Sequence, residues 1–112
     1  MILARAVGLF VSYAAWRVAG LRGAGHVLVG ALGAEDETTR TIAGILLVRA
    51  ARKSEPLLKE ALNKREHLPA VLTVIGSLGD SKFAPELRKF SFDADPDVAQ
   101  AAKDALQLIE AQ

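Results

Sequence analysis

The chain of 112 residues contains no cysteine and only two histidines, and 5% of its residues are aromatic. The absence of cysteine excludes disulfide bonds, thiolate ligands for zinc or an iron–sulfur cluster, and a cysteine nucleophile. The histidines, His26 and His67, lie far apart in the sequence, and neither belongs to a ligand-spaced motif. We therefore expect no bound metal and no cofactor.

A strong charge of one sign is also missing. The formal net charge is +1, which provides no general electrostatic attraction to nucleic acid, so nucleic acid is not expected as a partner. The cations between residues 49 and 65 alternate with Glu55 and Glu60, a mixture typical of a solvated or protein-binding face. With 51% hydrophobic residues, the chain is too apolar to be disordered, and its length predicts one small domain.

Acidic residues are absent from the first third of the chain. Residues 1–33 contain Arg5, Arg17 and Arg22, and the first acid is Glu35. The first 33 residues therefore carry a charge of +3, whereas the other 79 residues carry −2. This division predicts different surroundings for the two parts.

No hydrophobic run is long enough for an unbroken membrane span. A spanning helix needs about 20 apolar residues, whereas the run from Ala6 to Trp16 reaches about half that length before Arg17 interrupts it. A span therefore requires the Arg17 side chain to extend to one membrane interface. A signal peptide is not expected, because no polar cleavage region follows the apolar run.

The spacing of the apolar residues predicts a helix over residues 2–20. Apolar side chains occupy two adjacent stripes of this helix, and small residues with two arginines occupy the opposite side. The small side is suited to close contact with another helix or with lipid headgroups. The first stripe holds Leu3, Val7, Phe10, Ala14, Val18 and Leu21, the second holds Ile2, Ala6, Leu9, Tyr13 and Trp16, and the opposite side holds Arg5, Gly8, Ser12, Ala15, Ala19 and Arg22.

Three surroundings fit this helix: the core of its own domain, a membrane, or a partner protein. If half of the two stripes stays exposed, the apolar area exceeds what a soluble monomer usually shows. We therefore expect residues 1–23 to attach the protein to a membrane or to a larger complex. Trp16 suits the domain core as well as an interface. The candidate membrane- or partner-binding residues are Arg5, Phe10, Tyr13, Trp16, Arg17 and Arg22.

Regular helix signals begin after residue 33. Asp95 is expected to cap a helix over residues 96–110, with Pro96 in its first turn. The inner side of this helix is predicted to hold Val98, Ala102, Ala105 and Ile109, and the inner side of the helix over 38–52 is predicted to hold Ile42, Ile45 and Leu46. Other helices are expected over residues 55–62, 66–78 and 82–90.

These helices repeat with a period of about 30 residues, which is typical of an α-solenoid. The best-matching stretch runs from Val74 to Asp80, continues with Phe83 to Leu87, and then with Asp95 to Val98. It resembles HEAT-like repeats of the short kind found in phycobilisome lyase subunits. The resemblance covers residues 24–112 and implies an all-α fold: a short right-handed α-solenoid of about three helix pairs, preceded by the apolar N-terminal helix, 1–23.

No constellation suited to catalysis is found in the sequence. The serines have no local base or nucleophile elbow, and the glycines of residues 20–33 lack the Lys-Ser/Thr that follows a phosphate loop. Asp93, Asp95 and Asp97 lack the glycine and the glutamate of a calcium loop, so helix capping is the simpler role. We expect the protein not to be an enzyme.

The expected function is that of a cytoplasmic adaptor or accessory subunit, located at the inner face of the membrane if residues 1–23 contact lipid. Two alternatives remain: a soluble HEAT-like scaffold with the first helix in its own core, and a partner subunit of a lyase-like enzyme. In the solenoid, the second helix of each pair would form a concave partner-binding face. Its candidate residues are Arg40, Thr73, Ser77, Gln100, Lys103 and Gln107.

Overall fold

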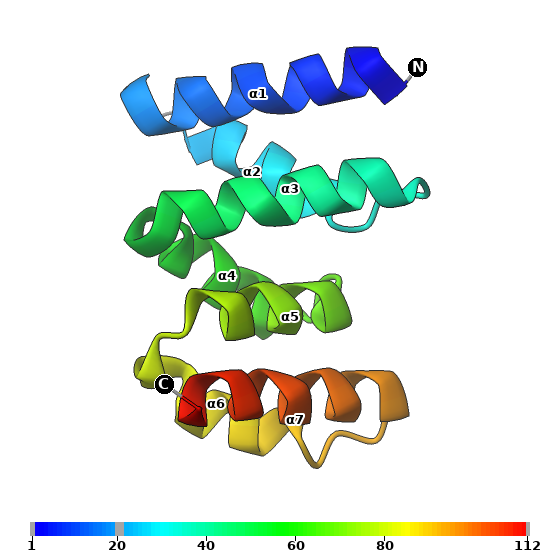
Figure 1. Ribbon diagram of the computed structural model, residues 1–112, viewed down its shortest axis with the longest axis vertical. Coiled ribbons are helices and arrows are strands. Elements are labelled where there is room, and N and C mark those ends of the chain that lie inside the picture. Colours follow the sequence, from blue (N-terminus) through cyan, green and yellow to red (C-terminus); the bar gives the residue numbers. More distant parts are fainter. Residues whose placement is uncertain (1, 20–21, 112) are drawn as a thin grey trace. The chain divides into compact units, whose positions relative to one another are not determined.

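The computed structural model describes residues 2–19 and 22–111, and the side chains of residues 6–17 and 23–111. The described chain is all-α, as predicted (Figure 1). It divides into two compact units, Met1–His67 (unit 1) and Leu68–Gln112 (unit 2). The expected boundary after residue 23 lies inside unit 1.

The described residues of unit 1 form four α-helices and a short 3₁₀ helix. Its elements are α1 (Ile2–Ala19), α2 (Arg22–Ala31), α3 (Glu37–Ala50), the 3₁₀ helix η1 (Ala51–Ser54) and α4 (Glu55–Lys64). Helix α1 packs against both α2 and α3. Helices α1 and α3 run in the same direction, with their C-terminal ends on the same side (Figure 1).

The ends of α3 follow from local hydrogen bonds. The Asp36 carboxylate caps the first turn, where it accepts hydrogen bonds from the backbone N–H of Thr39 at 2.8 Å and from the Thr39 hydroxyl. The helix stops at Ala51, which has a φ of 50°. The buried Ser54 hydroxyl then donates to the Leu47 carbonyl at 2.5 Å, so η1 folds back onto the last turn of α3.

The core of unit 1 includes one close helix approach at Gly25 of α2. A Cβ atom at Gly25 would lie 2.7 Å from Leu57 Cδ1 and 3.1 Å from the Trp16 ring. A Cβ atom at this position would therefore displace the end of the Leu57 side chain and press on the Trp16 ring, so glycine suits the packing of α2 between α1 and α4.

Unit 2 contains α5 (Leu68–Leu78), a 3₁₀ helix η2 (Ser81–Phe83), α6 (Ala84–Phe90) and α7 (Pro96–Glu110). The Asp95 carboxylate caps α7 by accepting from the Asp97 backbone N–H at 2.9 Å, and Pro96 lies in the first turn. Both features were predicted from the sequence. The predicted inner side of α7 is also confirmed, because Val98, Ala102, Ala105 and Ile109 are buried.

Helices α5 and α7 make the closest contact in unit 2. A Cβ atom at Gly76 would lie 2.7 Å from the Ala105 Cα atom. Because the neighbouring atom belongs to the backbone, a side chain at residue 76 would push the two helices apart.

Two sequence expectations about unit 1 differ from the structure. Ile45 was expected on the inner side of α3, but it is exposed, and that inner side is formed by the neighbouring Leu46 and Leu47. Helix α2 was not among the predicted helices, because its glycines obscured the helical pattern.

Candidate docking surface

Helix α1 has a buried inner face. Leu9 and Trp16 are each 3% exposed, and the Trp16 ring meets the Tyr13 ring edge-on at a centroid distance of 6.5 Å. Leu9 and Trp16 are seven residues apart and therefore lie on one side of the helix. The inner face thus anchors α1 in unit 1.

The opposite face of α1 is apolar and open. Val7, Phe10 and Val11 are 56%, 53% and 63% exposed, and Ala14 is exposed beside them. Their spacing of three and four residues places them on one stripe. We name Val7, Phe10, Val11 and Ala14 the outer stripe. Three large exposed apolar side chains on one helix face are typical of a surface that another molecule covers.

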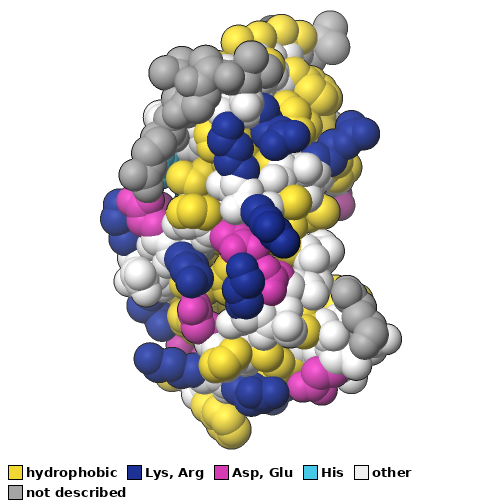
Figure 2. All heavy atoms as spheres, turned by 90° about the vertical axis from the view of Figure 1, so that its left-hand side faces the viewer, with side chains coloured by type: hydrophobic (Ala, Val, Ile, Leu, Met, Phe, Trp, Pro, Cys, Tyr) yellow, Lys and Arg dark blue, Asp and Glu magenta, His cyan; other side chains and the backbone are white. Residues whose placement is uncertain are grey.

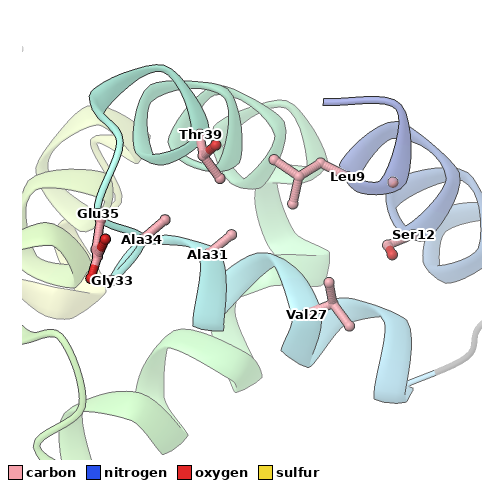
Figure 3. Close-up of a pocket in the computed structure, with 9 residues that line it drawn as sticks. Leu9, Ser12, Val27, Ala31, Gly33, Ala34, Glu35 and Thr39 are labelled. Atoms are coloured by element: carbon pink, nitrogen blue, oxygen red, sulfur yellow. The ribbon is translucent and has the colours of Figure 1, made fainter. Parts of the chain in front are cut away.

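A groove borders the side of α1 that carries Gly8 and Ser12, opposite Phe10 and Ala14 (Figure 3). It has a volume of about 630 Å³ and lies among α1, α2 and the start of α3. Gly8, three residues before Val11, lines it, and no described atom lies within 4 Å of the place of a Cβ there. The other lining residues are Leu9 and Ser12 of α1, Val27 and Ala31 of α2, Gly33, Ala34 and Glu35 of the turn, and Thr39 of α3.

Cations gather where α1 and α3 end. The Lys53 ammonium donates to the Arg17 backbone carbonyl at 3.0 Å, which ties η1 to the end of α1. Arg17, Arg49 and Arg52 are exposed. We name Arg17, Arg49, Arg52 and Lys53 the basic cluster. Figure 2 views unit 1 from this side and shows Lys and Arg side chains over it.

The basic cluster is not neutralised by ion pairs. None of the ion pairs among the described residues involves Arg17, Arg49 or Arg52. Arg17 lies three residues after Ala14, so the cluster begins where the outer stripe ends. One acid, Glu35, lines the groove, and Asp36 and Glu37 follow it at the start of α3, the opposite end of that helix from Arg49.

A separate polar contact joins α2 to α4 on the surface of unit 1. The Glu60 carboxylate accepts a hydrogen bond from Lys64 at 2.9 Å and lies 2.9 Å from His26 Nε2. The Lys64 and His26 hydrogen bonds lower the pKa of Glu60 to about 2. This pair of contacts is structural and lies on α2 and α4, away from the outer stripe.

The predicted N-terminal site residues fall into three groups. Phe10 and Arg17 are exposed, as a docking role requires. Tyr13 is half-buried and Trp16 is buried. The sequence allowed Trp16 either in the domain core or at an interface. It lies in the core and is not a surface anchor. The side chains of Arg5 and Arg22 lie outside the described part of the chain.

The outer stripe differs from the predicted set in containing Val7, Val11 and Ala14. The spacing of Val7, Phe10 and Ala14 was the available signal, because these three residues share one predicted stripe. The basic cluster depends on the contact of η1 with α1, which joins residues 36 positions apart. No local pattern in the sequence indicates it.

The residues predicted for a concave face have different surroundings. Arg40 lies in unit 1, where its Nη1 atom donates to the carbonyls of Ala34 and Glu35 at 2.7 Å each and fixes the turn before α3. The other five residues lie on exposed positions of unit 2. They are Thr73 and Ser77 on α5, and Gln100, Lys103 and Gln107 on α7.

Comparison of the chain with known proteins gives no family. No protein-family model, no curated protein and no solved structure matches it. Within residues 2–19 and 22–111, none of the helices combines the length and the hydropathy needed to cross a membrane. In the same part of the chain, no three His, Asp or Glu side chains converge as a metal site requires.

Proposed function

We propose that the protein is a non-catalytic interaction module of HEAT-like helix pairs, and that it attaches to a larger complex through the outer stripe of α1. The observation that carries this proposal is the division of α1 into two apolar faces. The inner face, with Leu9 and Trp16, is used for folding, whereas Val7, Phe10 and Val11 on the outer face are more than half exposed.

The composition of the outer stripe adds support. Val7, Phe10, Val11 and Ala14 are all apolar and exposed, so this face of α1 makes an unfavourable contact with water. Covering it with another molecule removes this surface from water and gains about 25 cal/mol for each Å² buried.

Point substitutions test the proposal better than truncation. Removing residues 1–22 also removes Leu9 and Trp16 from the core, so a truncated chain would unfold and lose every interaction. Phe10→Asp places a charge in the outer stripe and leaves the inner face unchanged. Phe92→Asp is the matched control, because Phe92 is 88% exposed and lies in unit 2.

The experiment is fractionation of detergent-free extracts from the native cells, expressing the untagged wild type or one variant. We expect the wild type and Phe92→Asp to elute with a large complex, and Phe10→Asp to elute as the free chain. If Phe10→Asp stays in the same complex, the outer stripe is not the attachment site. If the wild type elutes as a free monomer, the protein is not an attached subunit.

A further inference from the structure

The outer stripe and the groove lie on opposite sides of α1, and both are open in the single chain. We infer that they bind each other between copies, so that the outer stripe of one chain docks in the groove of a second copy. The larger complex then contains several copies of this chain. This inference rests on the proposed function, because it keeps the outer stripe as the attachment site and names its partner.

The groove is open to side chains from outside. It has a volume of about 630 Å³, and its exposed lining residues are Gly8, Val27, Gly33 and Glu35. Val27 is 50% exposed, so part of the groove wall is apolar surface in contact with water. Figure 3 shows the Val27 and Ala31 side chains pointing from α2 into this space. A docked Phe10 side chain would leave water together with Val27, which favours the contact.

The positions of the two surfaces let one chain use both at once. Phe10 and Ala14 project from one side of α1, whereas Gly8 and Ser12, which line the groove, are on the opposite side. A chain whose stripe is docked in a neighbour therefore still has its own groove open for a third copy. Contacts between unlike surfaces of identical chains produce a ring or an open row of copies.

The charges beside the two surfaces are opposite in sign. Arg17 is exposed where the outer stripe ends, three residues after Ala14, and Glu35 is exposed in the lining of the groove. Neither side chain makes an ion pair among the described residues. A stripe that docks with its Arg17 end toward Glu35 brings these two charges together, and their attraction favours that direction of docking.

Two other occupants account for less of the surface. A lipid surface would cover the outer stripe, but it would leave the groove and the exposed Val27 side chain in water. Two copies that meet stripe to stripe would also leave both grooves open. In that arrangement the two α1 helices, which contain no acid, would provide no opposite charge for Arg17.

The test mixes two variants that each lack one of the two surfaces. Phe10→Asp has a charge in the outer stripe and an intact groove. Gly8→Arg has an intact stripe and a long charged side chain at the groove, where a Cβ atom meets no described atom within 4 Å. Gly23→Arg is the matched control, because Gly23 is also an exposed helical glycine with a free Cβ position, and it does not line the groove.

Sedimentation velocity of the purified full-length chain measures the assembly, and circular dichroism checks that each variant is folded. We expect the wild type and Gly23→Arg to form dimers and larger assemblies as the protein concentration rises. Phe10→Asp and Gly8→Arg should each associate at least ~10-fold more weakly. Their equimolar mixture should form dimers and nothing larger, because one intact stripe meets one intact groove and the other two surfaces are blocked.

The charge of the interface is tested separately. Arg17→Glu should weaken the assembly by about fivefold, because it places an acid where the docked stripe meets Glu35. Arg88→Glu is the matched control and should leave the assembly unchanged, because Arg88 is also an exposed arginine in the last turn of a helix, α6 of unit 2. Equal effects of the two substitutions would contradict the proposed direction of docking.

Three results would overturn the inference. The first is a wild type that stays monomeric at every concentration, including one that binds vesicles of phosphatidylcholine and phosphatidylserine through Phe10. The second is a mixture that associates no better than either variant alone. The third is a dimer that Phe10→Asp dissociates and Gly8→Arg does not, which would indicate stripe-to-stripe contact. If Phe10→Asp releases the native complex while the purified wild type is a monomer, the proposed function holds and only the partner is wrong.

Discussion

Helices α1 and α7 are each buried on one side, but the residues on their exposed sides differ in kind. Each buries one face in its own unit: α1 through Leu9 and Trp16, and α7 through residues such as Ala102 and Ala105. Their outer faces differ. That of α7 holds Gln100, Lys103, Asp104 and Gln107, with one large apolar side chain, Leu108, exposed at its edge, whereas that of α1 holds Val7, Phe10, Val11 and Ala14.

This difference separates the requirements of folding from those of binding. An apolar inner face is sufficient to fix a helix in a unit, as α7 demonstrates. The outer stripe of α1 therefore adds nothing that folding needs, and its exposure to water is unfavourable. Docking of another molecule on this stripe, as we propose, would remove it from water.

The strongest test of this comparison is substitution of the two faces of α1. Trp16→Ala should lower the free energy of unfolding by about 3–5 kcal/mol, because it leaves a cavity in the core of unit 1. Phe10→Ala, on the outer stripe, should lower it by less than ~1 kcal/mol. Chemical denaturation followed by circular dichroism measures both changes. Equal losses would mean that the outer stripe also serves folding.

The packing of α7 can be broken separately. Gly76→Ala should destabilise unit 2 by about 1–3 kcal/mol, because its Cβ would lie 2.7 Å from the Ala105 Cα atom. Gly8→Ala is the control in α1, where the added methyl group meets no described atom within 4 Å. It should stabilise α1 by about 0.5–1 kcal/mol through helix propensity. Thermal unfolding monitored by calorimetry distinguishes the two, and stabilisation by Gly76→Ala would contradict the close contact of α5 with α7.

A smaller effect is expected where α3 turns toward the basic cluster. Ala51 has a φ of 50° and a ψ of −118°, a conformation that glycine adopts without strain and alanine does not. Ala51→Gly should therefore raise the free energy of unfolding by about 1 kcal/mol. Urea denaturation gives the value. A loss of stability would mean that α3 does not end in this conformation.

The smallest effect concerns the surface contact between α2 and α4. The hydrogen bonds from Lys64 and His26 lower the pKa of Glu60 from 4.5 to about 2, so the folded state favours the ionised carboxylate. Its contribution to stability is complete above pH 4.5 and is lost as the pH falls toward 2. In Glu60→Gln, the melting temperature should decrease less over this pH range than in the wild type. Identical decreases would show that the contact does not persist in solution.

The sequence predicted those features that depend on neighbouring residues. The Asp95 cap, Pro96 in the first turn of α7 and the buried stripe of that helix all follow from spacing within 15 residues. The apolar stripes of α1 were identified in the same way. Which stripe turns inward was not predictable, because both are apolar, and only the packing of Trp16 beside Gly25 decides it.

Features that depend on distant residues were not predicted. The groove is formed by three helices and a turn, and the basic cluster needs the Lys53 ammonium beside the Arg17 carbonyl. Ile45 was misplaced on α3 because adjacent apolar residues in that helix fit more than one inner side. In each case tertiary packing, which the local pattern does not contain, selects one arrangement.

The most direct test of whether the outer stripe serves binding and not folding measures both properties in one variant. For Phe10→Asp, the free energy of unfolding and the elution of the native complex are determined side by side with Phe92→Asp. We predict that both variants keep the wild-type stability to within ~1 kcal/mol and that only Phe10→Asp leaves the complex. The account is contradicted if Phe10→Asp remains in the complex, or if it loses its fold along with its binding.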